Sequence, residues 1–573
     1  MKGIIRVVAN PHEKNSCVVA HPGSVVTLMK HGSLRGMRIV FINMPLRESA
    51  APNTPPQGPG LMAARLREYG ADPSIVDLNA YRIKDDDAMR RNLQNGRHLT
   101  EREAQTLIES HFNKHGEPHV IGLSGKITTL KWQSRIAAMC RRLVPEAFII
   151  SGGGLSTEIK KGLFDWIPDL DAIGHSEGDD IMLLIAKDVK AALGSQNPST
   201  LHAKNPYHIG EIAGRHRFVY AGDRPTDLDI LPFAAWDLLE EDVFGNPVLE
   251  WYIKTPVWGT AANNSSATPF TMKRSLTTVS SRGCPFDCAF CYRGAQGERN
   301  YGLRSVENLT AEVKWLQDRY GVDFVGFPDD NFAVRIDRCQ ALPRAFEGLN
   351  FRWGTHTRLD EADMKRLPPM REAGCVYIGF GAESASEKTL IRLKKGGHIL
   401  KRGFVRVNGF VFPRTMVEGI QNCREIGIHS NCTWIMGYPG ETLDDLKVSV
   451  AFIMWQQELY TGGLTQGTEA YGVALASVNK RMFTATAYPG TAMFRDPDVK
   501  GLLTKHFGIT FGTDGEPVCD EALKWYIEEL DDATKVLVGK NGEPLNYGAM
   551  PLDRFLEARL YVDSGQIEKI LDM

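Results

Sequence analysis

The stretch SLTTVSSRGCPFDCAFCYRG, residues 275–294, joins a short apolar segment to three closely spaced cysteines. Residues 275–281 are rich in β-branched and small side chains, which favours a strand. Cys284, Cys288 and Cys291 follow, with three and then two residues between them, and Gly283 precedes the first. A short loop with a flanking glycine can bend its backbone around a compact ligand. The sequence therefore predicts a strand that ends in a loop of three thiols.

The spacing of the three cysteines indicates a metal cluster. Three thiolates on one loop can bind three irons of a 4Fe–4S cluster and leave the fourth iron without a protein ligand. A structural zinc site needs a fourth ligand, and the next candidates, Cys339 and His356, are not at zinc-finger spacing. We expect Cys284, Cys288 and Cys291 to hold an iron–sulfur cluster, and zinc or a chance grouping remain the alternatives.

Strand and helix patterns alternate on the carboxyl side of this loop. Helical periodicity is found in residues 306–320 and 444–459. Six strand candidates with crossovers favour a partial (β/α)6 barrel over residues 271–495, and function in such barrels lies at the carboxyl ends of the strands. The strand candidates are residues 275–281, 322–330, 351–358, 375–384, 431–440 and 482–490.

A second alternation of strands and helices precedes the barrel, in residues 37–195. It predicts a Rossmann-like, doubly wound parallel sheet, so the fold class is α/β throughout. Its strand candidates are residues 37–45, 73–78, 119–125, 146–154 and 170–178. Ligands of such sheets bind beyond the carboxyl ends of the strands. The side chains and glycines at those ends include Pro45, Ser124, Gly152 to Gly154 and Glu177. Glycines that simply make tight turns are the alternative.

The remaining segments are less informative. Residues 1–36 are expected to form an N-terminal extension, and residues 496–573 a C-terminal region of mixed, mostly helical character. Residues 196–270 are richer in Pro, Asn, Ser and Thr, which predicts a linker with some ordered elements.

Composition excludes several classes of function. Among 573 residues, 67 Lys and Arg nearly balance 69 Asp and Glu, so no overall positive charge attracts nucleic acid or an anionic membrane. No apolar run is long enough to cross a bilayer, and the N-terminal residues do not resemble a signal peptide. The other cysteines are scattered, which does not suggest a disulfide framework. We expect a cytoplasmic protein.

The three-cysteine motif followed by an aromatic residue, Tyr292, resembles the signature of radical S-adenosylmethionine enzymes. The resemblance implies that S-adenosylmethionine binds the open iron and is cleaved to a 5′-deoxyadenosyl radical, with an electron donor such as flavodoxin or ferredoxin. It extends over residues 270–495 and implies cosubstrate contacts from later strand segments, namely Arg358, Glu383, Gly437, Pro439 and Gly440. A structural salt bridge at Arg358 and a solvated strand end at Glu383 are the alternatives. Asp329 and Asp330 stand where the family usually has a Gly-Gly-Glu segment, so their role stays open, with helix capping as an alternative.

The preceding domain resembles that of the cobalamin-binding subclass of these enzymes. The resemblance rests on the segment from Asn43 to Tyr81, with an acid-terminated second strand at Asp77, and on GLSGKITTL, ISGGGLSTE and GHSEGDD. It implies cobalamin contacts from the later strand ends, namely Ser124, Gly152, Gly153, Gly154 and Glu177. No Asp-x-His occurs in residues 37–195, so no histidine of the usual Asp-x-His-x-x-Gly motif reaches cobalt. A module that binds nothing is the alternative.

The combined resemblance implies a cobalamin-dependent methyltransferase. A methyl group would pass from S-adenosylmethionine through methylcobalamin to an unactivated carbon, or to phosphorus, of a small-molecule or peptide substrate of natural-product type. An oxidative cyclisation or rearrangement on the same scaffold is the main alternative, because GYPGET at 437–442 and YPGT at 488–491 resemble anaerobic magnesium-protoporphyrin ester cyclases. A non-enzymatic cobalamin sensor is an alternative from another class. A methylthiotransferase would usually carry three further cluster cysteines.

Overall fold

A computed structural model describes residues 29–46, 48, 54–194, 205–222, 224–255, 272–292, 301–530, 532 and 534–573. The chain divides into two compact units. The front unit comprises Met1–Pro225, Ile230–Tyr252 and Thr510–Asp531, and the barrel unit comprises Thr226–Asp229, Ile253–Ile509 and Asp532–Met573. Among the described residues, no helix combines the length and apolar character that crossing a membrane requires.

The front unit is built on a seven-stranded sheet with strand order β2-β1-β3-β4-β5-β7-β6. Its first five strands pair in parallel, which confirms the doubly wound sheet. The order reverses between β1 and β3, the position where such sheets bind ligands. The strands are β1 (Arg38–Asn43), β2 (Asp72–Asp77), β3 (Val120–Ser124), β4 (Phe148–Gly152), β5 (Ala172–Ser176), β6 (His208–Ile212) and β7 (Arg215–Gly222).

The last two strands lie in the segment that we expected to be a linker. β7 pairs in parallel with β5, and β6 pairs antiparallel with β7. Ala213 and Gly214 join them with φ values of 51° and 74°. Positive φ at both central residues is typical of the two-residue turns that connect the two twisted strands of a β-hairpin. The front sheet therefore extends to Gly222, beyond the expected boundary at residue 195.

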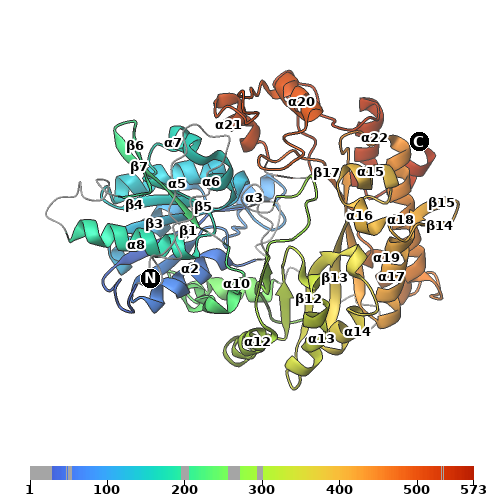
Figure 1. The fold of residues 1–573 in the computed structure, drawn as a ribbon, viewed down its shortest axis with the longest axis horizontal. Coiled ribbons are helices and arrows are strands. Elements are labelled where there is room, and N and C mark those ends of the chain that lie inside the picture. The colour runs from blue at the N-terminus through green and yellow to red at the C-terminus, as the bar shows by residue number, and fades with distance from the viewer. Residues whose placement is uncertain are drawn as a thin grey trace, which may run out of the picture. The chain divides into compact units, whose positions relative to one another are not determined.

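Helices cover both faces of the front sheet. Figure 1 shows α5 and α6 on one side of the strands, and α2 and α8 on the other. Ile181, Leu184 and Ile185 of α8 are buried, as an amphipathic helix on a sheet requires. The helices of this unit are α2 (Gln57–Glu68), α3 (Asp86–Arg90), α4 (Glu101–His115), α5 (Leu130–Leu143), α6 (Gly154–Ile159), α7 (Leu163–Trp166), α8 (Asp179–Leu193), α21 (Glu521–Glu528) and most of α10 (Val248–Lys254), within which the unit ends at Tyr252.

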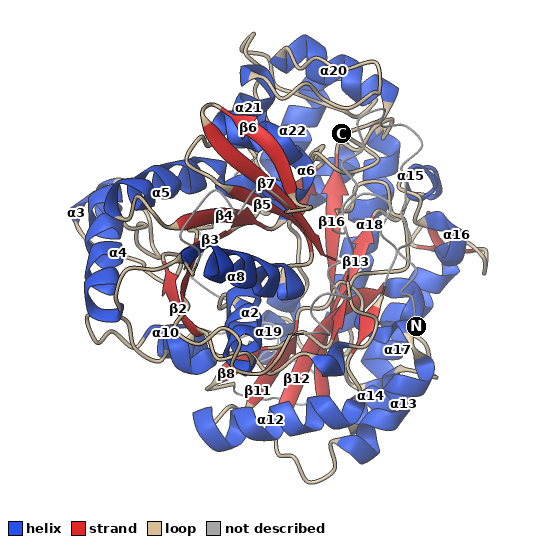
Figure 2. Ribbon diagram, turned by 60° about the vertical axis from the view of Figure 1, so that its left-hand side comes forward, coloured by secondary structure: helices blue, strands red, loops and turns tan. Residues whose placement is uncertain are grey.

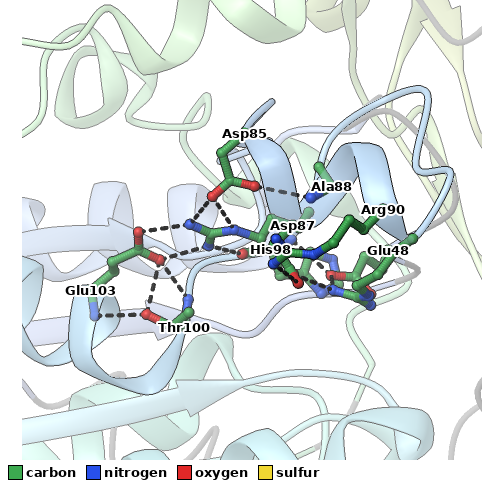
Figure 3. A network of polar contacts seen from close by, with 10 residues as sticks. Glu48, Asp85, Asp87, Ala88, Arg90, His98, Thr100 and Glu103 are labelled. Atoms are coloured by element: carbon green, nitrogen blue, oxygen red, sulfur yellow. Dashed lines mark hydrogen bonds and ion pairs between the residues drawn. The ribbon is translucent and has the colours of Figure 1, made fainter.

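An ion-pair network fixes the loop between α3 and α4 (Figure 3). Arg97 lies 2.8 Å from Glu103 and 2.7 Å from Asp85. Thr100 and Glu103 form a capping box at the start of α4, and Asp85 caps α3 through the amide of Ala88. Since each acid serves both a helix terminus and the arginine, the loop is held at its two ends.

The barrel unit is built on six parallel strands in the order β17-β16-β13-β12-β11-β8. Spatial order follows chain order, so all six predicted strands and the partial barrel are confirmed. The strands are β8 (Ser275–Thr277), β11 (Phe324–Phe327), β12 (Arg352–Arg358), β13 (Cys375–Glu383), β16 (His429–Met436) and β17 (Met482–Thr484). Two antiparallel strand pairs accompany them, β9 (Ser281–Arg282) with β10 (Gly302–Leu303), and β14 (Phe404–Val407) with β15 (Phe410–Pro413).

Helices cover the outer face of this sheet. Figure 2 shows α13, α14 and α17 on one side of β11, β12 and β13. The helices are α12 (Val306–Tyr320), α13 (Ile336–Ala345), α14 (Leu367–Glu372), α15 (Glu387–Arg392), α16 (Gly396–Ile399), α17 (Arg414–Ile426), α18 (Leu443–Thr461), α19 (Glu469–Ser477), α20 (Pro497–Phe507) and α22 (Leu552–Asp563).

Alternation along β12 separates its two faces. Trp353 is fully buried on the outer face, against Phe327 and Phe332. Because successive strand residues point to opposite faces, His356 and Arg358 lie on the other face. We call this the inner face, and it is the face that the candidate site uses.

Candidate active site

The three-thiol loop, Cys284–Cys291, follows β8 and β9 at the carboxyl ends of the barrel strands. Its middle is held by backbone hydrogen bonds to two distant segments. The amide of Ala289 donates to the carbonyl of Leu393 at 2.9 Å, and the amide of Met493 donates to the carbonyl of Ala289 at 2.8 Å. These segments follow α15 and β17, so two parts of the chain that are distant in sequence position the loop.

Arg358 connects β12 to this loop. Its Nη1 lies 3.6 Å from the sulfur of Cys288, and its guanidinium lies 4.0 Å from the centre of the Phe286 ring. Asp360 holds the other side of the same guanidinium, with an Nε–oxygen distance of 2.9 Å. A buried cation that is fixed on one side and faces a sulfur on the other stabilises negative charge on the thiol group.

Two thiols of the loop lie in a desolvated setting. Cys291 is exposed as a residue, and its Sγ lies 3.6 Å from the carbonyl oxygen of Tyr292. Desolvation of its thiol nevertheless raises the pKa of Cys291 to about 12, and repulsion from Cys288 and Asp330 adds to the rise. Burial also raises the pKa of Cys284. Since metals bind the thiolate, cluster assembly must release protons from this loop.

Asp329 and Asp330 hold the backbone that leads into the loop. The buried carboxylate of Asp329 accepts hydrogen bonds from the amide of Ser280 at 2.8 Å and from the hydroxyl of Ser281 at 2.7 Å. Asp330 accepts from the amide of Gly283 at 3.1 Å. Neither acid caps a helix, so the helix-capping alternative is wrong for both in this structure.

Glu383 ends β13 on the inner face. It is buried, has a φ of 66°, and lies 3.2 Å from the ammonium group of Lys395. A residue other than glycine whose backbone is in the left-handed region costs free energy, and it persists only where the surrounding structure holds it there. The ammonium group of Lys395 also lies 6.0 Å from the ring centre of Phe290 in the three-thiol loop. Glu383 is thus brought to the same end of the barrel as the cysteines.

The segment Gly437–Gly440 makes a tight turn after β16. Gly437 and Gly440 have φ values of 73° and 75°, which favour glycine at both positions. Glu441 is fully buried, and its side-chain Oε2 accepts a hydrogen bond from the amide of Gly437 at 2.6 Å. Arg392 donates to the carbonyl of Gly440 at 2.5 Å. Pro439 lies between them and is half-buried, so the predicted glycine turn exists and is braced from both sides.

The predicted front residues gather at the carboxyl ends of β3 and β4. Ser124 and Gly152 are register partners. A Cβ atom on Gly153, whose φ is 92°, would lie 2.4 Å from the carbonyl oxygen of Gly125, whereas one on Gly152 would meet nothing within 4 Å. Gly154 begins α6. Backbone here is therefore closely packed at Gly153 and open at Gly152, which suits the approach of a bulky ligand.

Glu177 follows β5 at the same edge of the front sheet. Its carboxylate lies 2.8 Å from Nε of Arg224, and both side chains are largely buried. Ser176, before it, has a φ of 68°, and its amide donates to the Thr157 hydroxyl at 3.1 Å. The ion pair orients Glu177 at the end of its strand.

The donor set of the loop fits an iron–sulfur cluster. Among the described parts of the chain, no three His, Cys, Asp or Glu side chains converge on a single metal ion. In a cluster, each cysteine thiolate binds a different iron. The absence of a site for a single metal ion among the residues described therefore does not argue against a cluster. Cys284, Cys288 and Cys291 share one short loop beside the cation of Arg358, and this arrangement suits an anionic cluster.

Several residues of the site were not predicted. Asp360 and Lys395 hold the predicted Arg358 and Glu383, and Glu441 braces the glycine turn. The acid of PGET at 439–442 was a visible signal for Glu441, whereas Lys395 lies in a basic run without any distinguishing pattern. His356 was considered only as a zinc ligand, but it lies on the inner face next to Arg358.

Sequence comparison matches residues 278–453 to the Radical SAM superfamily. An uncharacterised methyltransferase of Pyrococcus horikoshii is 22% identical over 68% of this chain and 71% of its own length. Cytidylyl-2-hydroxyethylphosphonate methyltransferase of Streptomyces wedmorensis is 26% identical over 69% of this chain and 72% of its own. The anaerobic magnesium-protoporphyrin IX monomethyl ester cyclase of Rubrivivax gelatinosus is 24% identical over 67% of this chain and 63% of its own.

Solved structures with the same fold include two cobalamin-related enzymes. The cobalamin-dependent S-adenosylmethionine radical enzyme OxsB, with aqua-cobalamin and S-adenosylmethionine bound, superposes over 87% of this chain with a TM-score of 0.59 and 15% identity. This chain spans 55% to 66% of the OxsB chain. The methyltransferase TsrM from Kitasatospora setae, with tryptophan and a S-adenosylmethionine analogue bound, superposes over 93% of this chain and 89% of its own with a TM-score of 0.56 and 13% identity.

Proposed function

We propose that this protein, whose barrel is a radical S-adenosylmethionine domain, is a cobalamin-dependent methyltransferase. It transfers a methyl group from S-adenosylmethionine to an unactivated carbon, or to phosphorus, of a small-molecule or peptide substrate. The observation that carries the proposal is that one chain combines two sites. These are the three-thiol loop beside Arg358 and the glycine-lined carboxyl edge of the front sheet, open at Gly152.

The loop residues hold a 4Fe–4S cluster and orient the cosubstrate. When bound, the cluster supplies an electron to S-adenosylmethionine, and cobalamin supplies a transferable methyl group. Cys284, Cys288 and Cys291 ligate the cluster, and Arg358 offsets the charge of the Cys288 thiolate. Asp329 fixes the backbone at the start of the loop, which keeps the ligands preorganised.

The cosubstrate contacts come from the loop and from the ends of three barrel strands. Arg358 and Glu383 supply polar groups on the inner face, and each is already oriented by an ion pair. The Gly437–Gly440 turn supplies backbone groups to which a flat adenine ring can come close, with Pro439 between its glycines. Tyr292 supplies the aromatic side chain that follows the last cysteine.

Cobalamin binds at the carboxyl edge of the front sheet. Ser124 and Gly152 are register partners there, and the absence of side chains at Gly152, Gly153 and Gly154 lets backbone amides approach the corrin or its phosphate. Glu177, oriented by Arg224, supplies a fixed acceptor at the neighbouring strand end. An electron donor such as flavodoxin or ferredoxin completes the system, which we place in the cytoplasm.

Similarity to named enzymes supports methyl transfer and leaves cyclisation as the alternative. Relatives named as methyltransferases match 68% and 69% of this chain. One of them is named for a phosphonate, which supports a phosphorus-containing compound as one class of substrate. Oxidative cyclisation is the second candidate, because a named ester cyclase matches 67% of the chain and the Gly437–Thr442 turn resembles the cyclase segment.

The proposal is tested by anaerobic reconstitution with iron, sulfide and cobalamin. We expect one cluster and one cobalamin per chain, and both S-adenosylhomocysteine and 5′-deoxyadenosine as coproducts. Cys284→Ala, Cys288→Ala and Cys291→Ala each abolish 5′-deoxyadenosine formation, whereas Cys339→Ala, a change at a buried cysteine outside the loop, retains it. Full cleavage activity in a loop variant, or a protein that binds no cobalamin, would overturn the proposal.

A further inference from the structure

His356 lies in the middle of β12 on the inner face. It is two residues before Arg358 and therefore points to the side of the sheet that carries the three-thiol loop. Unlike Thr355 and Thr357, its buried neighbours on the outer face, His356 is exposed. Exposure in the middle of a strand that is paired on both sides shows that the imidazole is accessible from within the barrel.

A glycine on the neighbouring strand makes room for this ring. Gly379 of β13 is the register partner of His356. A Cβ atom on Gly379 would lie 2.6 Å from Cδ2 and 3.1 Å from Nε2 of His356. Since real Cβ atoms do not come this close, the imidazole occupies the volume that any other residue at 379 would fill.

Tyr377 brings a second polar group to the same place. It lies two residues before Gly379 on the same face, and a Cβ atom on Gly379 would lie 3.6 Å from its hydroxyl oxygen. The Tyr377 ring stacks on His429 at a centroid distance of 5.8 Å, which fixes its orientation. An imidazole and a phenol thus converge above Gly379, one residue layer below Arg358.

The surroundings favour an uncharged ligand group. The charged side chains of the inner face nearest to this place are paired with each other, Arg358 with Asp360 and Glu383 with Lys395. Desolvation of the ring by the surrounding barrel lowers the pKa of His356 to about 4, although part of its surface is accessible. The imidazole is therefore neutral near pH 7 and offers both a donor and an acceptor.

We propose that His356 and Tyr377, converging over Gly379, form a substrate subsite that binds an uncharged hydrogen-bonding group, such as a hydroxyl or an amide, of the methyl acceptor. The inference rests on the proposed function, since it assumes that the substrate enters the barrel beneath the cluster loop. It adds a recognition element, because a site built to hydrogen-bond a polar group rejects analogues that lack it.

The test first needs an acceptor, and a metabolite extract supplies one. The reconstituted enzyme is incubated with deproteinised extract of the source organism and methyl-deuterated S-adenosylmethionine, and labelled compounds are identified by mass spectrometry. The unlabelled acceptor is then titrated into the cofactor-loaded enzyme to measure its Kd. His356→Leu should raise this Kd at least about tenfold, and Tyr377→Phe about threefold to tenfold, while iron content stays that of the wild type.

Two further variants separate recognition from loss of structure. His356→Gln, which keeps a donor and an acceptor, should recover much of the affinity that His356→Leu loses. Gly379→Ala, which displaces the imidazole without removing it, should weaken binding like His356→Leu. His216→Asn, a change at an exposed histidine of β7, is the matched control and should leave the Kd unchanged.

Different results would overturn the proposed function and the proposed subsite. If the wild type labels no compound of the extract, the proposed function fails and the subsite falls with it. If the wild type labels an acceptor, and His356→Leu and Tyr377→Phe bind that acceptor with the wild-type Kd, only the subsite is overturned. An acceptor that carries no uncharged hydroxyl or amide group would likewise contradict it.

Discussion

Arg358 places Nη1 at 3.6 Å from the sulfur of Cys288 while Nε and Nη2 hold the two carboxylate oxygens of Asp360 at 2.9 Å and 3.2 Å. One planar guanidinium thus links the third barrel strand to the three-thiol loop. The fork geometry matters, because a lysine ammonium cannot make the paired contact and reach the sulfur as well.

We predict that Arg358→Lys lowers 5′-deoxyadenosine formation at least about tenfold, because the cation no longer stays beside Cys288. The measurement is single-turnover cleavage of S-adenosylmethionine by reconstituted protein of matched iron content. Arg335→Lys, at an exposed ion pair with Asp337, is the control and should behave like the wild type. An Arg358→Lys enzyme with unchanged cleavage would show that the contact has no role.

Asp329 is predicted to be a structural support of the cluster loop. Asp329→Ala leaves the amide of Ser280 and the hydroxyl of Ser281 without their buried acceptor, which should cost about 2–4 kcal/mol of stability. Iron incorporation should fall with it, whereas Asp329→Asn, which keeps an acceptor oxygen, should lose less of both. The measurements are chemical denaturation and iron content after reconstitution, and equal iron content in all three proteins would contradict this role.

Much of the barrel could be predicted because each of its strands carries its own local signal. The segments from 275–281 to 482–490 are apolar, end in turn residues and alternate with helical patterns, and parallel order follows from chain order. The hairpin β6–β7 was not predicted, because short strands around Ala213 and Gly214 lie within a segment of linker-like composition. The grouping of Thr510–Asp531 with the front unit depends on long-range packing that no local pattern reports.

Adjacent glycines of the front sheet should respond differently to the same change. Gly152→Ala should leave stability within about 0.5 kcal/mol of the wild type, since the new methyl group meets nothing within 4 Å, yet weaken cobalamin binding by direct obstruction. Gly153→Ala should destabilise the front unit itself, because its Cβ would lie 2.4 Å from the carbonyl oxygen of Gly125 at a φ of 92°. Thermal unfolding and equilibrium cobalamin binding separate the two, and unchanged affinity in Gly152→Ala would place the corrin elsewhere.

The pH dependence of stability should report on Glu441. Burial raises its pKa to about 8 from an ordinary value of 4.5, so the protonated form is favoured in the folded protein. Its contribution is therefore present at low pH and lost as pH rises through about 8. Glu441→Gln, which cannot ionise, should be more stable than the wild type at pH 9 by about 1–4 kcal/mol, with the difference shrinking toward pH 5.

The control for this titration is Glu347→Gln, a change at an exposed acid of the same unit. It should show no difference from the wild type that grows with pH. Unfolding free energies measured from pH 5 to pH 9 decide the matter, and a gap between wild type and Glu441→Gln that stays constant with pH would mean that Glu441 does not titrate in this range.

The site itself could be predicted only where a motif marks the residues. The cysteines, Arg358 and Glu383 follow from short patterns, whereas His356 becomes informative only when the register shows Gly379 beside it. The role of Lys395 likewise becomes visible only through its contact with Glu383, which lies twelve residues earlier in the sequence, before α15. Such relationships come from strand pairing and helix placement, which a single sequence does not specify.

Methyl transfer is the central claim, and the fate of a labelled methyl group tests it most directly. Turnover with methyl-deuterated S-adenosylmethionine is followed by mass spectrometry of the product and of both coproducts. The account predicts a product heavier by one fully deuterated methyl group, with S-adenosylhomocysteine and 5′-deoxyadenosine in roughly equal amounts after correction for uncoupled cleavage, since the two-cofactor chemistry consumes one cosubstrate for each. An unlabelled product formed with 5′-deoxyadenosine alone would contradict methyl transfer and favour the cyclase alternative.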